Sequence, residues 1–265
     1  MRQRLICLVV LSFWTLSAYA GVLGTADSFA VLGASTVTNT GSSVLHGDLG
    51  VFPGTAITGF PPGIVHGATY IDDGVAMGAQ ADALTAYNYL AGLAVTQTLT
   101  GQDLGGLTLD TGVYFFKTSA QMTGQLTLDF QGLSNQMIVF QIGSTLTTAS
   151  ASSVLLINPG NDDSVFWQVG SSATLGTTTA LYGSIIADQS ITLTTGATID
   201  CGRAIALNGA VTLDTNTVDT GTCATTTGTT PPGTGTPEPG TATLLGMGLL
   251  LSLMVYGRSS RKKAT

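Results

Sequence analysis

The sequence predicts a mostly β domain, a three-sided β-solenoid with one long α-helix packed alongside. The first observation is a repeat, because a Thr-Leu pair recurs at intervals of 19, 18, 29, 18 and 20 residues. A period near 18 to 20 residues that holds three short strand-like runs is typical of a three-sided solenoid. The second observation is one alanine- and leucine-rich stretch, residues 75–95, which lacks proline and is apolar at helical spacing.

The first 20 residues are expected to be removed from the mature protein. They hold two early arginines, an apolar centre and a small-residue end at Ala18-Tyr19-Ala20, which is the pattern of a secretory signal peptide. A transmembrane anchor is the alternative, but the apolar run is short. We therefore expect export, cleavage by signal peptidase, and a mature domain over residues 21–223.

Residues 29–70 show strand and turn signals of the same kind as the repeat. We expect them to add one or two coils, with Thr36 and Thr38 in positions comparable to the repeat threonines. The predicted helix, residues 75–95, follows directly. A helix of about 20 residues spans roughly 30 Å, and six strands stacked at about 4.8 Å cover roughly 24 Å, so one helix can lie along the whole stack.

Each repeat divides into three strands, which in one unit cover residues 190–194, 197–200 and 203–207. Side chains alternate between the two faces of a strand, so the threonine of each pair should point outward and the leucine inward. The third strand is apolar on both faces, as in "IVFQI" and "VFWQV", which indicates that the helix covers this side. The leucines expected to stack inside are Leu109, Leu128, Leu146, Leu175, Leu193 and Leu213.

The C-terminal region is interpreted as a linker followed by a sorting signal. Residues 224–236 have the Thr/Pro/Gly composition of an unfolded linker. Residues 237–265 begin with a Pro-Glu-Pro motif and end with a group of basic residues. The apolar run between them is a predicted transmembrane segment at about residues 241–257. This order resembles the signal cut by exosortases in Gram-negative bacteria that make exopolysaccharide. The resemblance implies transient inner-membrane anchoring, then secretion or display at the cell surface.

The charge of residues 21–223 excludes several classes of function. Lys117 and Arg203 are the basic residues there, against fourteen aspartates and no glutamate, which gives a net charge of −12. Such a domain cannot build a nucleic-acid surface. A polysaccharide lyase or hydrolase would need clustered carboxylates with a basic partner, and no GxSxG, P-loop or HExxH motif is present. We predict that the protein is not an enzyme.

A few polar residues are candidates for a metal or catalytic site. His46 and His66 each lie in a His-Gly turn, where a structural histidine is the favoured interpretation. The clusters Asp72-Asp73 and Asn161-Asp162-Asp163 have calcium-binding chemistry, but neither has the spacing of a known calcium loop. We interpret them as solvated loop residues and expect no metal and no cofactor.

The combined motifs resemble the microbial ice-binding (antifreeze) protein family. The resemblance is carried by "FAVLGASTVTNTG", one long helix, "FQIGSTLTTAS", "VFWQVGSSATLG" and "GRAIALNGAVTLD", and it covers nearly all of residues 21–223. It implies a discontinuous, right-handed β-helix with a helix alongside, and a surface that adsorbs to ice. The family's ice-binding motif, Thr-Ala/Gly-x-Thr/Asn, is present at residues 195–198, with incomplete matches at residues 148–151 and 177–180.

Elementary physical chemistry supports this function. Threonines on adjacent coils are about 4.8 Å apart, and those two apart on a strand about 6.6 Å, so they form a flat array of fixed spacing. Threonine offers a hydroxyl to water, a methyl group that limits competing hydration, and a stiff χ1. Two alternatives stay open. Threonine is also simply a good exposed strand residue, and an exported adhesive or structural protein of the exopolysaccharide matrix needs no ice activity.

The predicted ice-binding surface has a centre and a border. Outward aspartates, Asp110, Asp129 and Asp214, stand two residues after repeat threonines, so we expect the uncharged face to be confined to three coils. The centre is predicted at Thr145, Thr147, Thr174, Thr192 and Thr194. The border is predicted at Thr177, Thr195, Thr198, Thr212, Thr215 and Thr217.

Three cysteines are present, and Cys7 would leave with the signal peptide. Cys201 and Cys223 then remain as an even pair in an oxidising compartment. We expect a disulfide between them at the last coils, with two buried thiols as the alternative.

Overall fold

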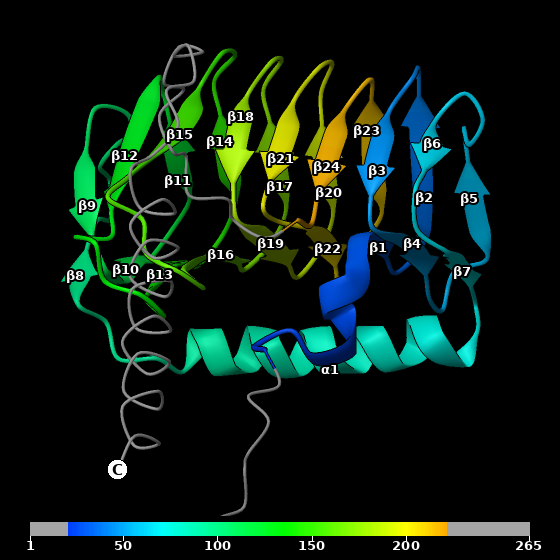
Figure 1. Ribbon diagram of the computed structural model, residues 1–265, viewed down its shortest axis with the longest axis horizontal. Helices are drawn as coiled ribbons and strands as arrows, with labels where there is room; N and C mark the ends of the chain where they lie inside the picture. The colour runs from blue at the N-terminus through cyan, green and yellow to red at the C-terminus, as the bar shows by residue number, and fades with distance from the viewer. Residues whose placement is uncertain (1–20, 222–265) are drawn as a thin grey trace, which may run out of the picture. The chain divides into compact units, whose positions relative to one another are not determined.

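The computed structural model describes residues 21–221. In this part of the chain, three parallel β-sheets form a solenoid with one α-helix along its outside (Figure 1). The predicted three-sided solenoid and its single long helix are therefore confirmed. The predicted signal peptide, linker and sorting signal lie outside the described residues, as does the predicted transmembrane segment. Within residues 21–221, no helix is long and apolar enough to cross a membrane.

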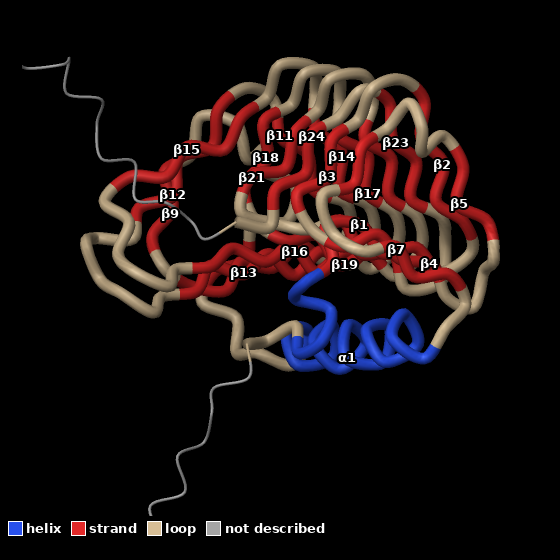
Figure 2. The backbone as a smooth tube through the Cα atoms, turned by 45° about the vertical axis from the view of Figure 1, so that its right-hand side comes forward, coloured by secondary structure: helices blue, strands red, loops and turns tan. Residues whose placement is uncertain are grey.

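Each complete coil contributes one strand to each sheet, and the view in Figure 2 shows the coils stacked side by side. The coils at the two ends of the stack are incomplete, so the three sheets differ in their number of strands. We call the nine-stranded sheet beneath the helix sheet A. Its strands, in spatial order, are β7 (Thr69–Ile71), β4 (Asp48–Val51), β1 (Phe29–Gly33), β22 (Ala204–Ala206), β19 (Ser184–Ala187), β16 (Ser164–Val169), β13 (Met137–Ile142), β10 (Gly112–Phe116) and β8 (Gln97–Thr98).

The other two sides of the solenoid are sheets B and C. The strands of sheet B, in spatial order, are β11 (Ala120–Met122), β14 (Leu146–Thr148), β17 (Ala173–Leu175), β20 (Ile191–Leu193), β23 (Val211–Asp214), β2 (Thr36–Thr40) and β5 (Ala56–Thr58). The strands of sheet C are β6 (Ile64–Val65), β3 (Val44–His46), β24 (Thr217–Asp219), β21 (Thr198–Asp200), β18 (Ala180–Tyr182), β15 (Ser153–Ile157), β12 (Gln125–Asp129) and β9 (Thr108–Asp110).

The stacking order of the coils is discontinuous in sequence. The coils formed by residues 29–71 come first in the chain, yet β1, β2 and β3 pair with β22, β23 and β24 of the last coil. The helix then runs back along the stack, and the next coil begins at the far end with β8 (Figure 1). The expected extra coils are present, and they extend the C-terminal end of the solenoid.

The helix α1 spans Gly74–Ala91. It begins where the Asp73 carboxylate accepts hydrogen bonds from the backbone N–H groups of Val75 and Ala76, at 3.1 and 2.9 Å, an N-cap that satisfies otherwise unpaired donors. The prediction of a helix over residues 75–95 is four residues too long at the C-terminal end. The reason is that the N–H of Thr96 already bonds to Val113 of sheet A, so the chain must leave the helix at Gly92.

The helix packs through small side chains. Its buried residues are Ala76, Ala79, Ala83, Ala86 and Leu90, and alanines let the helix approach the sheet closely. The facing residues on sheet A, Val139, Phe166, Ile186 and Ile205, belong to the same buried cluster. This contact explains why the third strand of each repeat is apolar on both faces, as predicted.

The interior of the solenoid is a solid core. All six leucines predicted to point inward are buried. They do not form one stack, because β9 and β12 carry Leu109 and Leu128 in sheet C, whereas Leu175, Leu193 and Leu213 line sheet B. The wide part of the core is filled by Trp167 and Phe140, whose rings stack with centroids 4.1 Å apart.

Candidate functional site

The outer face of sheet B carries one straight row of threonines, which we call the central row. Each member is the cross-strand partner of the next, so the row is set by the parallel register itself. Gln121 continues the line beyond Thr147. The central row consists of Thr147, Thr174, Thr192, Thr212, Thr38 and Thr58.

The hydroxyls of the central row are available to solvent. All six side chains are exposed or half-buried, and within residues 21–221 none of their hydroxyls hydrogen-bonds to the protein. Each hydroxyl can therefore donate to water and accept from it. The neighbouring strands are about 4.8 Å apart, and a β-branched side chain has restricted χ1, so these water-binding groups have a fixed spacing.

Two further rows flank the central row on sheet B. The row two residues earlier on each strand contains Thr145, whose hydroxyl donates to that of Ser119 at 2.8 Å. Its remaining members are small and uncharged: Ser172, Ser190, Ala210, Thr36 and Ala56. The row two residues later includes Thr194, Asp214 and Thr40. Asp214 is the single charged side chain in these three rows, and it accepts hydrogen bonds from the hydroxyls of Thr195 and Thr215.

The corner between sheets B and C is built from a repeated left-handed turn. One residue per coil has a φ between +55° and +81°, a region that favours glycine. The N–H of each such residue donates to a carbonyl of the next coil, that of the residue just before the equivalent turn position. The turns are therefore stacked. The stacked positions are Ala151, Thr178, Gly196, Thr215 and Gly41.

Buried polar side chains stabilise the same corner from inside. The hydroxyls of Thr148 and Thr179 are 2.7 Å apart, and Thr148 also accepts from the N–H of Gly176. Further along, Asn216 donates to the carbonyls of Thr194 and Ala197, both at 2.9 Å. Within the described residues, no completely buried side-chain nitrogen or oxygen atom lacks a partner. These bonds rigidly hold the edge of the threonine-bearing face.

Charged groups lie mostly on the other sides of the solenoid. On sheet C, burial raises the pKa of Asp200, and the neighbouring charge of Asp219 raises it further. His46 and His66 stack there with ring centroids 4.7 Å apart. In the described part of the chain, no three or more His, Cys, Asp or Glu side chains are grouped to hold a metal ion.

Comparison with known proteins adds to this geometry. Residues 31–219 match the family model described as ice-binding-like. The chain belongs to the ice-binding-like family. It is similar to an ice-binding protein of Nostoc sp. (strain HG1), with 52% identity over 98% of this chain and 97% of the relative.

Solved structures of the ice-binding-like family have the same fold. One is the ice-binding protein from the Antarctic ascomycete Antarctomyces psychrotrophicus, with TM-score 0.71 and 44% identity over 74% of this chain and 96% of that one. Another is an ice-binding protein from an Arctic yeast, with TM-score 0.67 and 29% identity over 82% of this chain and 96% of that one. The mostly β, parallel architecture predicted from sequence is thus shared with β-helix members of the family.

The predicted site residues fall on two sheets and the corner between them. Thr145, Thr147, Thr174, Thr192, Thr194 and Thr212 lie on or beside sheet B. The corner carries Thr177, Thr195 and Thr215, whereas Thr198 and Thr217 are cross-strand partners on sheet C. The family motif at residues 195–198 therefore crosses the corner. In the incomplete motifs, Thr148 and Thr179 are buried. Their hydroxyls form the hydrogen bonds inside the corner that are described above.

Two sequence-based placements are wrong. Asp110 and Asp129 do not limit the threonine face, because their strands belong to sheet C, where the two residues pair with each other. Thr147, not Thr145, is the partner of Thr174, because β14 is shifted by two residues from the predicted alignment. As a result, the threonine face extends further than the three predicted coils, and of the three aspartates only Asp214 lies on it.

Thr58 is the residue of the central row that sequence reasoning missed. Thr38 was expected in a position comparable to the repeat threonines but was not included in the predicted site. Thr58 ends "TAIT", where Ile57 points toward the core and Thr58 outward. This alternation is the signal that could have identified it. Both threonines join the central row because the N-terminal coils stack on the last coil.

Proposed function

We propose that this chain adsorbs to ice through the outer face of sheet B and thereby inhibits the growth or recrystallisation of ice outside the cell. The observation that carries the proposal is the central row, six threonines in register with hydroxyls that the protein leaves free. Its relatives named as ice-binding proteins support the same function. The role is adsorption, and it requires neither catalysis nor a cofactor.

The mechanism rests on preorganisation. The sheet fixes the spacing of the hydroxyls, and the β-branched side chains lose little freedom when the surface meets ordered water. The methyl groups between the hydroxyls exclude competing hydration, so water is held in a repeating pattern that can join an ice lattice. Asp214 interrupts the face only at its edge, where its carboxylate is already hydrogen-bonded by two threonine hydroxyls.

The predicted site set is kept in this proposal, with roles that depend on where each threonine lies. Thr147, Thr174, Thr192 and Thr212 contact ice through the central row, with Thr145 and Thr194 in the flanking rows. Thr177, Thr195 and Thr215 border the face at the corner. Thr198 and Thr217 are the first residues of their strands in sheet C, just past the corner. They therefore contribute only where ice extends around that corner.

A bulky substitution tests the site. Thr192→Tyr projects a ring from the middle of the central row, while the inward neighbours Ile191 and Leu193 keep the core intact. The variant should lose ice shaping and freezing-point depression with an unchanged circular dichroism spectrum. Asp162→Tyr, in a loop away from sheet B, is the matched control and should behave as the parent. Full activity in the Thr192 variant would show that the face is assigned wrongly.

A parent protein that neither shapes ice nor lowers the freezing point would instead favour the matrix role. In that case the exported protein would act as an adhesive or structural component, with exopolysaccharide as its partner. The same purified protein distinguishes the two roles, because ice adsorption needs no added ligand.

We also propose how the chain matures. Signal peptidase would remove residues 1–20, and an exosortase would cut near the Pro-Glu-Pro motif, so that the product is secreted or retained at the surface of a Gram-negative bacterium. Mass measurement of the native protein tests both cuts. If the C-terminal peptide is retained in the inner membrane, a permanently anchored protein replaces this proposal.

A further inference from the structure

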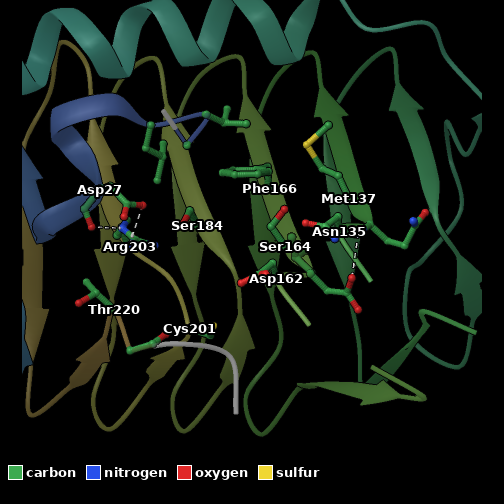
Figure 3. A pocket seen from close by; sticks show the side chains of 17 residues that line it. Asp27, Asn135, Met137, Asp162, Ser164, Phe166, Ser184, Cys201, Arg203 and Thr220 are labelled. Carbon is green, nitrogen blue, oxygen red and sulfur yellow. Dashed lines mark hydrogen bonds and ion pairs between the residues drawn. The ribbon is translucent and has the colours of Figure 1, made fainter. Parts of the chain in front are cut away.

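A cavity of about 750 Å³ opens beside the N-terminal segment, and its lining side chains are drawn in Figure 3. Its floor is the outer face of sheet A near the start of its strands, where Phe166 and Ser184 are direct cross-strand partners. One wall is formed by residues 21–27, and the other by the loops 130–136 and 158–163, which lead from sheet C into sheet A.

The walls of this cavity are held by their own polar contacts. Arg203 forms an ion pair with Asp27 at 2.9 Å, and its Nε donates to the Asp27 carbonyl at 2.8 Å. The Asp163 carboxylate accepts from the N–H groups of Gln136 and Gly160, at 2.8 and 2.6 Å. These contacts link the N-terminal segment to sheet A and the two loops to each other, so the cavity has a defined shape.

Other polar groups in the cavity remain unused. Ser184 is only 3% exposed, yet its hydroxyl has no hydrogen-bond partner among the described residues and lines the cavity floor. The side chains of Asn135, Asp162 and Ser164 also make no hydrogen bond within residues 21–221. A nearly buried hydroxyl without a protein partner is unfavourable unless a ligand or water completes it.

We propose that this cavity binds a neutral sugar unit of a polysaccharide. Sugar hydroxyls can donate to the Asp162 carboxylate, pair with the Asn135 amide and bond to the two serine hydroxyls. The half-buried Met137 and the small exposed part of Phe166 supply the apolar floor on which the C–H face of a sugar ring can lie. The cavity volume lies within the range of ordinary ligand sites.

Charge restricts the ligand class. Arg203 and Asp27 neutralise each other, and backbone N–H groups satisfy Asp163. Asp162 therefore remains as an unpaired carboxylate, and the domain around it is strongly acidic. An anionic sugar would be repelled at this site, whereas a neutral one gains a charge-assisted hydrogen bond.

The proposed sugar site goes beyond ice adsorption and does not depend on it. The cavity lies on sheet A beside the helix, and the central row lies on sheet B. A molecule attached to a polysaccharide through the cavity could therefore still present its threonines to ice.

Titration calorimetry on the purified protein tests the proposal, with glucose, galactose, mannose and N-acetylglucosamine as probes and glucuronate as the anionic comparison. At least one neutral sugar should bind saturably and more tightly than glucuronate. Asp162→Asn should weaken that binding by about tenfold or more, and Ser184→Leu, which fills the floor, should abolish it. Asp110→Asn, on sheet C, should bind as the parent does.

Ice shaping separates this site from the ice-binding face, because Asp162→Asn and Ser184→Leu should both leave it unchanged. The proposal is overturned if no neutral sugar binds, if glucuronate binds more tightly, or if the folded Asp162 variant binds as well as the parent. Since Asp162 is exposed, its replacement keeps the test valid even if the buried Ser184 variant does not fold.

Discussion

Thr38 and Thr212 are direct cross-strand partners on sheet B, although they lie near opposite ends of the domain's sequence. Thr212 pairs in turn with Thr192, and Thr38 with Thr58. Because parallel strands keep a nearly constant separation, the row crosses the discontinuity in the chain without a change of spacing. The N-terminal coils therefore enlarge the proposed ice-binding surface as well as covering the end of the solenoid.

Replacing Thr38 with tyrosine should reduce ice shaping and freezing-point depression several-fold. The ring would stand out of the central row, while the neighbouring Val37 remains in the core. Thr108→Tyr is the matched control, since Thr108 is an exposed strand threonine on sheet C, and it should retain the activity of the parent. Equal activity of the two variants, measured by nanolitre osmometry, would remove the N-terminal coils from the site.

Thr178→Gly should stabilise the domain by about 1 kcal/mol, because a β-branched residue with φ +55° is strained and glycine is not. The next coil already has Gly196 at the equivalent corner position. Thr177→Gly, one residue earlier, lacks this positive φ and should give no stabilisation. Urea unfolding of both variants checks the difference, and a less stable Thr178 variant would contradict it.

Asp200→Asn should raise stability at neutral pH and have little effect in acid. Burial and the charge of Asp219 raise the pKa of Asp200 in the folded protein above its unfolded value of 3.8. Its contribution to stability is therefore full below the unfolded pKa and is lost as the pH rises through the folded pKa. Asp200 is only partly buried and more than a third exposed, so screening by solvent limits the gain to less than about 1 kcal/mol.

Thermal melts from pH 3 to 7 measure this effect on Asp200. Asp162→Asn serves as the control, because it likewise removes one negative charge, but from an exposed loop between sheets C and A. A gain that is the same at both pH values, or the same in both variants, would show that Asp200 carries no specific penalty.

The disulfide between Cys201 and Cys223 stays a prediction, because Cys223 lies outside the described residues. The Cys201 sulfur is 3.2 Å from the carbonyl oxygen of Gly221, two residues before Cys223, so the chain passes close to it. Reduction should lower the free energy of unfolding by roughly 3 kcal/mol, the value for closing a loop of about 20 residues. Two alkylatable thiols in the unreduced, exported protein would contradict the pair.

Sequence reasoning identified the repeat, the inward leucines and the helix because each has a strong periodic signal. It placed Asp110 and Asp129 on the side that carries the central row, because a Thr-Leu pair suits an exposed strand on either sheet B or sheet C. A local pattern states which way a side chain points, but it does not state which of three similar sides the strand belongs to.

The register of β14 could not be predicted for a related reason. A shift of two residues leaves every side chain on its original face, so inside and outside positions look the same in both registers. In "TLTT" the structure selects the register in which the hydroxyl of Thr148 meets that of Thr179 across the corner. That hydrogen bond joins two different coils. The alternation of residues within one strand therefore cannot predict it.

The return of the chain along α1 determines the stage of synthesis at which the domain can fold. Strand β1 is among the first parts synthesised, but its inner neighbour β22 is among the last. In most solenoids a coil can fold on the one before it, and ends can melt independently. Here contacts of very large sequence separation must close before either terminus is stable, which slows folding. Nearly the whole domain must be made first, and its two termini should then unfold together in a single cooperative transition.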